Sequence, residues 1–318
     1  MADKNIVALV HGIRYEAQGI ISIELRPLAD AVFPSFEPGA HIDLHLPCGI
    51  NRSYSLLGSP HTLDRYVVAV LRDQNSRGGS AWIHDKLRVG TELVISAPRN
   101  HFPVDASAQK NVLLAGGIGI TPIFCMYREL LLKGSSPVLI YCVRSRAEAA
   151  MLDEITALGG KVYYHFDDES GSTPDLQALL RGYDKDSHFY GCGPVAMLDA
   201  FHAACEQLGY EFVHIERFTA AEIAASADAR TSYEVELAQS GQTLQIQAGE
   251  NLLNRLLDAG VDVGFACQEG LCGSCEVTVI DGEVDHRDSV LSPSEQATNT
   301  TMMVCVSGCK SAKLTLDL

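Results

Sequence analysis

Four cysteines in the C-terminal third constrain the fold of this chain most. Cys267, Cys272 and Cys275 stand within nine residues, with four residues between the first pair and two between the second. Cys305 follows thirty positions after Cys275. This spacing is typical of a plant-type [2Fe–2S] cluster, in which four thiolates converge on two irons. The region must therefore fold so that one tight loop meets a cysteine far along the chain.

Other uses of these cysteines match the pattern less well. Structural zinc usually takes paired Cys-x2-Cys ligands, and only one such pair is present. Disulfides are disfavoured in a reducing compartment, and inert thiols seldom cluster three in nine residues. Cys309, four residues after Cys305, is an alternative fourth ligand. Gly270 and Gly273 let the loop bend around a cluster with backbone amides directed at its sulfurs.

The net charge argues against nucleic acid as a partner. The chain has 318 residues with a formal charge of −16, whereas phosphate binding needs clustered cations. Residues 224–318 hold five basic and fourteen acidic side chains, a net of −9. This excess can steer the C-terminal part toward a basic protein surface, although acidity for solubility explains it equally well.

Targeting signals and cysteine usage favour a cytoplasmic protein. Met1–Asn5 lacks the basic start of a secretory signal, and no apolar core follows it. Ten cysteines without such a signal point to a reducing compartment. The longest uncharged run, between Lys110 and Arg128, contains three glycines and a proline, which makes a poor membrane helix. We therefore expect no membrane partner.

The length predicts about two domains, with one to three open, and the residue pattern divides the chain further. Residues 1–105 hold short alternating segments, which favour a small barrel or sandwich. Residues 106–223 alternate apolar runs with helix-like stretches, the rhythm of a parallel α/β sheet. The small, polar residues 224–232 resemble a linker. Residues 233–318 open with a hairpin and a helix at Asn251–Ala259.

Two glycine-rich turns follow predicted strands. Gly116, Gly117 and Gly119 lead from a strand into a predicted helix, and Tyr190–Pro194 forms a second turn of this kind. Such turns permit close approach to a pyrophosphate and leave helix amides free to bind it. Each turn taken alone is weak evidence for a nucleotide site, because glycines also make ordinary turns. The spacing also differs from the Gly-x-Gly-x-x-Gly pattern.

Two polar motifs lie in the first domain. Arg52–Leu56 alternates a cation, two hydroxyls and an aromatic ring along one strand, which suits a phosphate and a flat ring. Gly78–Ser80 precedes a predicted helix at Ala81–Lys86, so that amides and the Ser80 hydroxyl can cap a phosphate. Taken singly, each motif is also an ordinary strand or helix start.

Taken together and in order, these motifs resemble the phthalate dioxygenase reductase family, which includes vanillate demethylase reductases. The match spans essentially the whole chain. It implies a multidomain fold with an antiparallel β-barrel flavin domain, an α/β parallel-sheet nucleotide domain and an α+β, β-grasp ferredoxin domain. The matching segments are Arg52–Leu56, Gly78–Ser80, Gly116–Pro122, Cys192–Pro194, the four cysteines, Gly282–Asp288 and Leu314–Leu318.

The resemblance also implies cofactors and a partner. Such reductases pass a hydride from NADH to FMN, then single electrons through a [2Fe–2S] cluster to a Rieske-type oxygenase or O-demethylase. Electron counting agrees, because NADH gives two electrons at once and the cluster accepts one. The expected partner is thus the terminal oxygenase protein, and the reductase is expected to be a monomer.

Site residues are carried over from the same resemblance. Ser55 and Thr121 position hydride and electron transfer, and no side chain acts as a catalytic acid or base. Leu71 stands where relatives often have a basic residue, with Arg72 or Arg77 as candidates to supply that charge. The FMN set is Arg52, Ser53, Tyr54, Ser55, Val70, Leu71, Gly79, Ser80, Thr121 and Phe218; the NADH set is Gly116, Gly117, Gly119, Cys192, Gly193 and Pro194; the cluster ligands are Cys267, Cys272, Cys275 and Cys305.

Several alternatives stay open at this point. Arg144 and Arg146 could meet the 2′-phosphate of NADPH, whereas the acidic run Asp167–Glu169 favours NADH. Phe218 either covers the flavin or packs in the core. The chain could also be a stand-alone flavin reductase or oxidase, or a redox-sensing binding protein that carries both centres.

Overall fold

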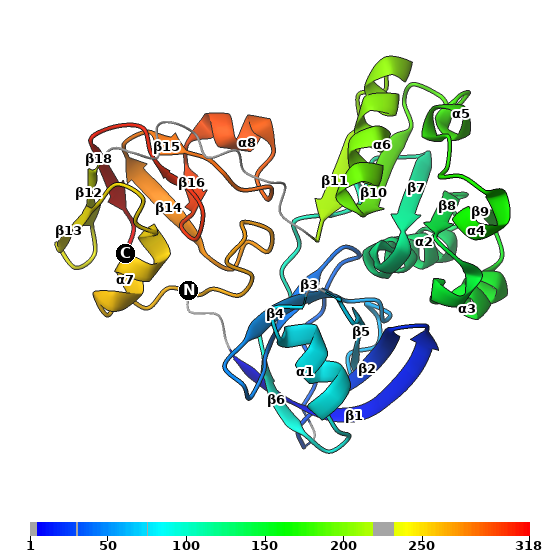
Figure 1. Ribbon diagram of the computed structural model, residues 1–318, viewed down its shortest axis with the longest axis horizontal. Helices are drawn as coiled ribbons and strands as arrows, with labels where there is room; N and C mark the ends of the chain where they lie inside the picture. Colours follow the sequence, from blue (N-terminus) through cyan, green and yellow to red (C-terminus); the bar gives the residue numbers. More distant parts are fainter. Residues whose placement is uncertain (1–4, 30, 75, 219–231) are drawn as a thin grey trace. The chain divides into compact units, whose positions relative to one another are not determined.

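The chain divides into two compact units, Met1–Phe218 and Thr219–Leu318, in this computed structural model (Figure 1). The linker predicted at 224–232 lies outside the described residues except for Ser232, and the predicted domain boundaries stay predictions. Within the described ranges, no helix combines the length and the apolar character needed to cross a membrane. The structure describes residues 5–29, 31–74, 76–218 and 232–318.

The first part of the N-terminal unit is a six-stranded antiparallel sheet closed into a barrel. Its strand order is β4-β3-β6-β1-β2-β5, and a bridge between Leu56 and Val68 joins its two edges. Alternate residues such as Ile42 and Leu44 face a buried core, as the two-residue period of a strand requires. The predicted barrel is confirmed. Its elements are β1 (Ile6–Ala17), β2 (Ile20–Pro27), β3 (His41–His45), β4 (Asn51–Ser55), β5 (Tyr66–Leu71), α1 (Gly79–Lys86) and β6 (Glu92–Ile95).

A parallel five-stranded sheet follows in the same unit, in the order β11-β10-β7-β8-β9. Leu113 of β7 packs toward α2 and Leu114 toward α6, so both faces of the strand are covered, which explains its continuous apolar run. The helices after β7 and β10 cover opposite faces, and the carboxyl ends of these neighbouring strands form a switch point where such sheets bind ligands. The elements are β7 (Asn111–Gly116), α2 (Ile120–Leu132), β8 (Val138–Val143), α3 (Leu152–Leu158), β9 (Lys161–Phe166), α4 (Asp167–Ser170), α5 (Leu176–Leu180), β10 (His188–Gly193), α6 (Val195–Leu208) and β11 (Val213–Arg217).

One buried cluster joins the barrel to the parallel sheet. Ile20 of β2 lies in it together with Ile120 and Phe124 of α2. Arg128, one turn further along α2, donates to the carbonyl of Leu57 at 3.3 Å. Burial of this shared apolar surface makes the two sheets a single compact unit.

The C-terminal unit is a mixed sheet with a short helix against it. Its order is β13-β12-β18-β14-β16, and only β12 and β18 pair in parallel. Helix α7 buries Leu252, Leu253 and Leu256 against the sheet. Asn251 caps its start, and Gly260 follows its end with φ of 77°. This is the β-grasp arrangement that the resemblance implies. The elements are β12 (Tyr233–Leu237), β13 (Thr243–Ile246), α7 (Leu252–Asp258), β14 (Glu276–Asp281), β15 (Val284–Asp285), α8 (Pro293–Thr298), β16 (Thr301–Met303), β17 (Gly308–Cys309) and β18 (Lys313–Leu316).

Candidate functional site

The four predicted cluster cysteines meet in the C-terminal unit. Cys267, Cys272 and Cys275 lie in the loop before β14, and Cys305 follows β16. Side-chain contacts join Cys267 to Cys272 and Cys305, and Cys305 to Cys275. All four residues are buried. Among the described residues, no three His, Cys, Asp or Glu side chains are grouped as ligands of one metal ion, whereas a two-iron cluster spreads four thiolates over two irons.

Backbone reversals shape the cysteine loop. Gln268, Gly270 and Gly273 have φ values of 58°, 67° and 71°, a left-handed conformation that costs roughly 1–2 kcal/mol for a residue with a Cβ. A Cβ on Gly270 would also lie 2.7 Å from Val306 Cγ2. Both glycines that the sequence suggests as bends therefore serve as bends. The chain also reverses at Gln268, a bend that could not be predicted because no glycine stands there.

Backbone amides of this loop point at sulfur. The N–H groups of Glu269 and Leu271 donate to Cys267 Sγ at 3.3 and 3.4 Å. The amide of Gly270 is hydrogen-bonded to the Cys305 thiol. Proteins use such amide–sulfur bonds to orient the ligands of an iron–sulfur cluster and to set its potential. The loop therefore fits the group that the cysteine spacing predicts.

The protein surroundings alone favour a protonated thiol at Cys305. The Cys267 thiol lowers the pKa of Cys305, but the Cys275 thiol and burial raise it more, to about 12. Metal ligation requires thiolates. Assembly of a cluster at this site must therefore release protons.

Cys309, the alternative fourth ligand, is engaged elsewhere. It lies on β17 and pairs in register with Val284 of β15. Its thiol is hydrogen-bonded to the carbonyl of Ser311 at 2.8 Å. Of the described cysteines, the structure thus brings Cys305 rather than Cys309 to the other three.

Arg52 and Tyr54 occupy one face of β4. They stand opposite Leu44 and Ile42 of β3, on the side of the barrel core. A Cβ on Gly79 would lie 2.7 Å from Arg52 Cγ, so the Arg52 side chain passes directly over the start of α1. A guanidinium and the free amides of a helix start are groups that bind phosphate. This corner of the barrel therefore fits the phosphate of a flavin nucleotide.

The serines of β4 occupy its other face. Ser53 Oγ donates to Asp43 Oδ1 at 2.5 Å, and Arg99 Nη2 donates to Oδ2 at 2.6 Å. Burial raises the pKa of Asp43, but Arg99 and Ser53 outweigh it and the net shift is downward. Ser55 is buried at the end of the strand. Sequence reasoning missed the pair Asp43–Arg99. An aspartate inside the otherwise apolar strand His41–His45 could have indicated that Asp43 needs a buried cationic partner.

The helix after the second flavin motif begins at Gly79, two residues before the predicted start at Ala81. Ser80 Oγ donates to Ser76 Oγ at 3.0 Å, and Ser76 Oγ accepts the N–H of Ala81 at 3.3 Å. Ser76 rather than Ser80 therefore satisfies a helix amide. The reason is that Gly78, with φ of 96°, turns the chain over the helix end.

The remaining flavin candidates differ in exposure. Val70 is fully buried in the barrel core, whereas Leu71 at the end of β5 is 39% exposed. Arg72, one candidate to replace a basic residue at position 71, donates to Asp85 at 3.1 Å. Phe218 is 39% exposed, which argues against the alternative that it is a core residue.

The two glycine turns touch each other at the switch point. A Cβ on Gly119 would lie 2.2 Å from the carbonyl oxygen of Cys192, and one on Gly193 would lie 2.9 Å from Gly116 Cα. Gly117 differs, because it has φ of 53° and open space around its Cβ position. Of the five glycines in the two turns, Gly116, Gly119 and Gly193 thus permit contact between the turns themselves. That contact places the starts of α2 and α6 next to each other.

Thr121 and Pro194 lie at these two helix starts. Thr121 is buried, and its Oγ1 donates to the carbonyl of Ile118 at 3.1 Å. Pro194 is the N-cap residue of α6, and its Cδ would lie 2.7 Å from a Cβ on Gly116. Both residues therefore stiffen the turns that the sequence assigns to the nucleotide.

Glu216 is an acidic side chain beside the second turn that sequence reasoning missed. On β11 it pairs in register with Cys192, whose Sγ lies 3.9 Å from Glu216 Oε2. Burial raises the pKa of Glu216 to about 8, while the contact with Cys192 lowers it slightly. Burial likewise raises the pKa of Cys192. The available signal was a lone carboxylate within the strand Val213–Arg217.

Comparison with known proteins agrees with this architecture. Two family models match, a 2Fe-2S iron-sulfur cluster binding domain at 235–310 and an oxidoreductase NAD-binding domain at 113–203. The phenoxybenzoate dioxygenase subunit beta of Ectopseudomonas oleovorans is 47% identical over 97% of this chain and 96% of its own length. The solved phthalate dioxygenase reductase is 37% identical, with a TM-score of 0.72 over 99% of this chain and 98% of that one. The chain belongs to the phthalate dioxygenase reductase family.

A larger relative contains the same architecture as one part. An intact type IV self-sufficient cytochrome P450 monooxygenase is 39% identical, with a TM-score of 0.91. The match covers 99% of this chain but 41% of the P450 chain. Members of the phthalate dioxygenase reductase fold thus occur as separate chains and as part of a longer one.

Membership of the phthalate dioxygenase reductase family makes the chain an oxidoreductase that uses NADH, FMN and a [2Fe–2S] cluster. When bound, FMN accepts two electrons together and releases them one at a time. The structure offers the cysteine loop and Cys305 for the cluster and the switch point at the ends of β7 and β10 for the nucleotide. Arg52 over the start of α1 is available for the flavin phosphate.

Proposed function

We propose that this chain is the reductase component of a two-component Rieske-type oxygenase or O-demethylase. NADH would reduce FMN in the N-terminal unit, and electrons would leave singly through the C-terminal cluster to the oxygenase. The observation that carries the proposal is one chain with a nucleotide edge, formed by the glycine turns at Gly116–Gly119 and Cys192–Pro194, and with three thiols of the cysteine loop brought to Cys305. The chain is related over 97% of its length to a dioxygenase subunit.

In this proposal the side chains of the protein position cofactors rather than transfer protons. Arg52 and the start of α1 would anchor the flavin phosphate, with Tyr54 on the same face of β4. The buried Thr121 and the interlocked turns at Gly119 would hold the nicotinamide in place. Holding two reacting groups in a fixed geometry is itself a large part of catalysis.

The same geometry supports NADH over NADPH. Arg146, which could have met a 2′-phosphate, donates to Glu169 Oε1 at 3.1 Å. Its guanidinium also lies 4.2 Å from the ring centre of Phe166. One of the two arginines that could meet a 2′-phosphate is therefore already paired with a carboxylate.

The proposed partner is the terminal oxygenase protein, met by the acidic C-terminal unit. Phthalate dioxygenase reductase is described as a structure for electron transfer from pyridine nucleotides to [2Fe–2S], and we carry that direction of flow to this chain. A monomer in the cytoplasm is part of the same proposal. None of the ten cysteines, all of which lie in the described residues, forms a disulfide, which suits a reducing compartment.

An anaerobic titration of the purified protein with NADH tests the proposal. Overlapping flavin and iron–sulfur absorption should bleach with about 1.5 equivalents of NADH, because the two centres together take three electrons. NADPH, titrated in parallel, should reduce the protein much more slowly. A colourless protein, or a flavin band alone with zinc in the cysteine loop, would leave at most a flavin reductase and would overturn the proposal.

A further inference from the structure

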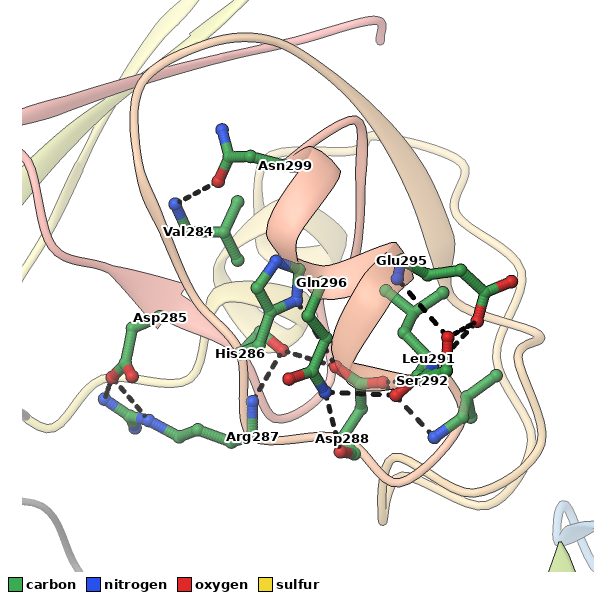
Figure 2. Close-up of polar contacts among 12 residues, drawn as sticks. Val284, Asp285, His286, Arg287, Asp288, Leu291, Ser292, Glu295, Gln296 and Asn299 are labelled. Carbon is green, nitrogen blue, oxygen red and sulfur yellow. Dashed lines mark hydrogen bonds and ion pairs between the residues drawn. The ribbon is translucent and has the colours of Figure 1, made fainter. Parts of the chain in front are cut away.

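Asp288 is a buried carboxylate in the C-terminal unit, in the segment between β15 and α8 (Figure 2). Its side chain is 0% exposed. Oδ2 accepts the N–H groups of Val290 and Leu291 at 3.2 and 2.9 Å, and Ser307 Oγ donates to Oδ1 at 3.4 Å. Burial of a carboxylate is costly unless such donors replace water. The fold therefore contains a site made for this side chain.

A buried imidazole lies beside the same carboxylate. The His286 side chain is 8% exposed, and its Nδ1 lies 3.6 Å from Asp288 Oδ1 (Figure 2). Among the described residues, neither ring nitrogen has a hydrogen-bond partner. Asp288 is thus a polar neighbour of a ring that is otherwise removed from water.

The Asp288 segment also holds the cysteine loop. The N–H of Ser289 donates to the carbonyl of Gly270 at 2.9 Å. The Gly270 Cβ position lies 3.0 Å from Asp288 Cα, so the two backbones are in contact. The amide of the same glycine is hydrogen-bonded to the Cys305 thiol. Ser307, which donates to Asp288, follows Cys305 by two residues. Asp288 therefore contacts both chain segments that bring ligands together.

We propose that Asp288 is a positioning residue for the iron–sulfur cluster: its carboxylate fixes the turn at Ser289–Leu291, whose Ser289 N–H holds the Gly270 carbonyl so that the Gly270 amide stays on the Cys305 sulfur, and its buried charge sets the potential of the cluster. The inference rests on the proposed cluster site. It assigns to Asp288 two separable effects, one through geometry and one through charge.

The two effects have different signatures. A buried negative charge close to the loop disfavours the addition of an electron, because Coulomb interactions are strong where water is excluded. Asp288→Asn keeps an oxygen acceptor for the two amides but removes the charge, so the potential should become less negative. Asp288→Ala also removes the acceptor, which frees the Gly270 segment and should loosen the cluster.

The test uses the full-length protein with its cofactors. We expect Asp288→Ala to lose its cluster absorbance to an iron chelator about 10- to 100-fold faster than the unmodified protein, in proportion to the 10- to 100-fold loss of metal affinity that follows removal of an outer-shell partner. The electron paramagnetic resonance spectrum of the reduced cluster should change as well. NADH should still reduce the flavin at its normal rate, since Asp288 belongs to the other unit. Asp285→Asn is the matched control, because Asp285 ends the preceding strand β15 and its carboxylate accepts a hydrogen bond from Arg287 at 2.7 Å.

The outcomes separate the inference from the function on which it rests. If the unmodified protein shows no [2Fe–2S] spectrum, the proposed function fails first. If the cluster is present but Asp288→Asn matches Asp285→Asn in potential and spectrum, the role of Asp288 is refuted. Where Asp288→Ala does not fold, Asp288→Asn alone decides, because a purely structural role would leave the potential unchanged.

Discussion

The nucleotide edge and the cysteine loop both depend on glycine, but for different physical reasons. Gly119 has an ordinary helical backbone and lacks room for a Cβ, because the carbonyl of Cys192 would lie 2.2 Å away. Gly270 and Gly273 instead have positive φ values that reverse the chain. Gly119 is required because Cys192, more than seventy residues further along the chain, lies against it. Gly270 and Gly273 are required mainly by the local path of the backbone.

This difference separates an assembled site from a local one. The nucleotide edge is built from two turns that the pairing of β7 with β10 brings together. The cysteine loop supplies three of four ligands from one stretch, and a single long-range step adds Cys305. The assembled site should be sensitive to small displacements, and the local site to the loss of a ligand.

The largest expected effect is the loss of a ligand in the cysteine loop. Cys305→Ser should lose the [2Fe–2S] spectrum and the NADH-driven reduction of cytochrome c, while NADH-driven dye reduction through the flavin remains. Cys309→Ser is the control and should keep both activities, because its thiol is bonded to Ser311. Cys272→Ser should behave like Cys305→Ser. Retained cytochrome c reduction in either ligand variant would contradict the proposed order of electron flow.

The second prediction tests the assembled site. Gly119→Ala forces the two turns apart, and a displacement of this kind costs about 100-fold in kcat/KM for NADH. Stopped-flow measurement of flavin reduction reports it, while the cluster spectrum should not change. Gly117→Ala is the comparison variant, because its Cβ position is open but its φ of 53° strains a residue with a Cβ by roughly 1–2 kcal/mol. It therefore tests backbone strain without a clash between the turns, and its loss in kcat/KM should be smaller than that of Gly119→Ala. Equal losses in both variants would show that backbone conformation, rather than contact between the turns, decides.

The third prediction compares the half-buried carboxyl of Glu216 with a solvent-exposed one. The pKa of Glu216 is raised from 4.5 to about 8, so the folded protein retains a proton that the unfolded chain loses. This contribution to stability is complete below about pH 4.5 and is lost as the pH rises to 8. One unit of pKa corresponds to about 1.4 kcal/mol, and we expect the free energy of unfolding of the N-terminal unit to fall by at least that amount.

Thermal release of flavin fluorescence, measured from pH 5 to pH 8, checks the Glu216 prediction. Glu216→Gln should flatten the pH dependence, whereas Glu206→Gln on the exposed side of α6 should leave it as it is. An unchanged slope in Glu216→Gln would mean that other groups carry the proton uptake.

The smallest effect concerns coenzyme choice. Glu169→Gln should free the Arg146 guanidinium, which then becomes available to a 2′-phosphate. An exposed ion pair is worth about 0.2–1 kcal/mol, so kcat/KM for NADPH should rise by at most about fivefold. Arg146→Ala in the same background should abolish the gain. A gain that survives in the double variant would exclude Arg146 as the responsible cation.

Much of the cysteine loop could be predicted because its constraints are local. The sequence shows the spacing of Cys267, Cys272 and Cys275 and the two glycines at the bends directly. The structure places these residues as expected. Less could be predicted for Arg52–Leu56, since alternate side chains of one strand face opposite ways. Ser53 is turned to Asp43, a partner on the neighbouring strand that no local pattern announces.

The sequence by itself determined the order of the modules, the cysteine set and the glycine turns, because spacing and backbone freedom are properties of short segments. Only the tertiary structure decided which distant groups meet. Gly119 against Cys192, Glu216 beside the same cysteine, and Asp288 next to Gly270 are such contacts. They depend on strand register and on burial. Register makes neighbours of side chains that are far apart in the chain, and the exclusion of water then shifts their pKa values.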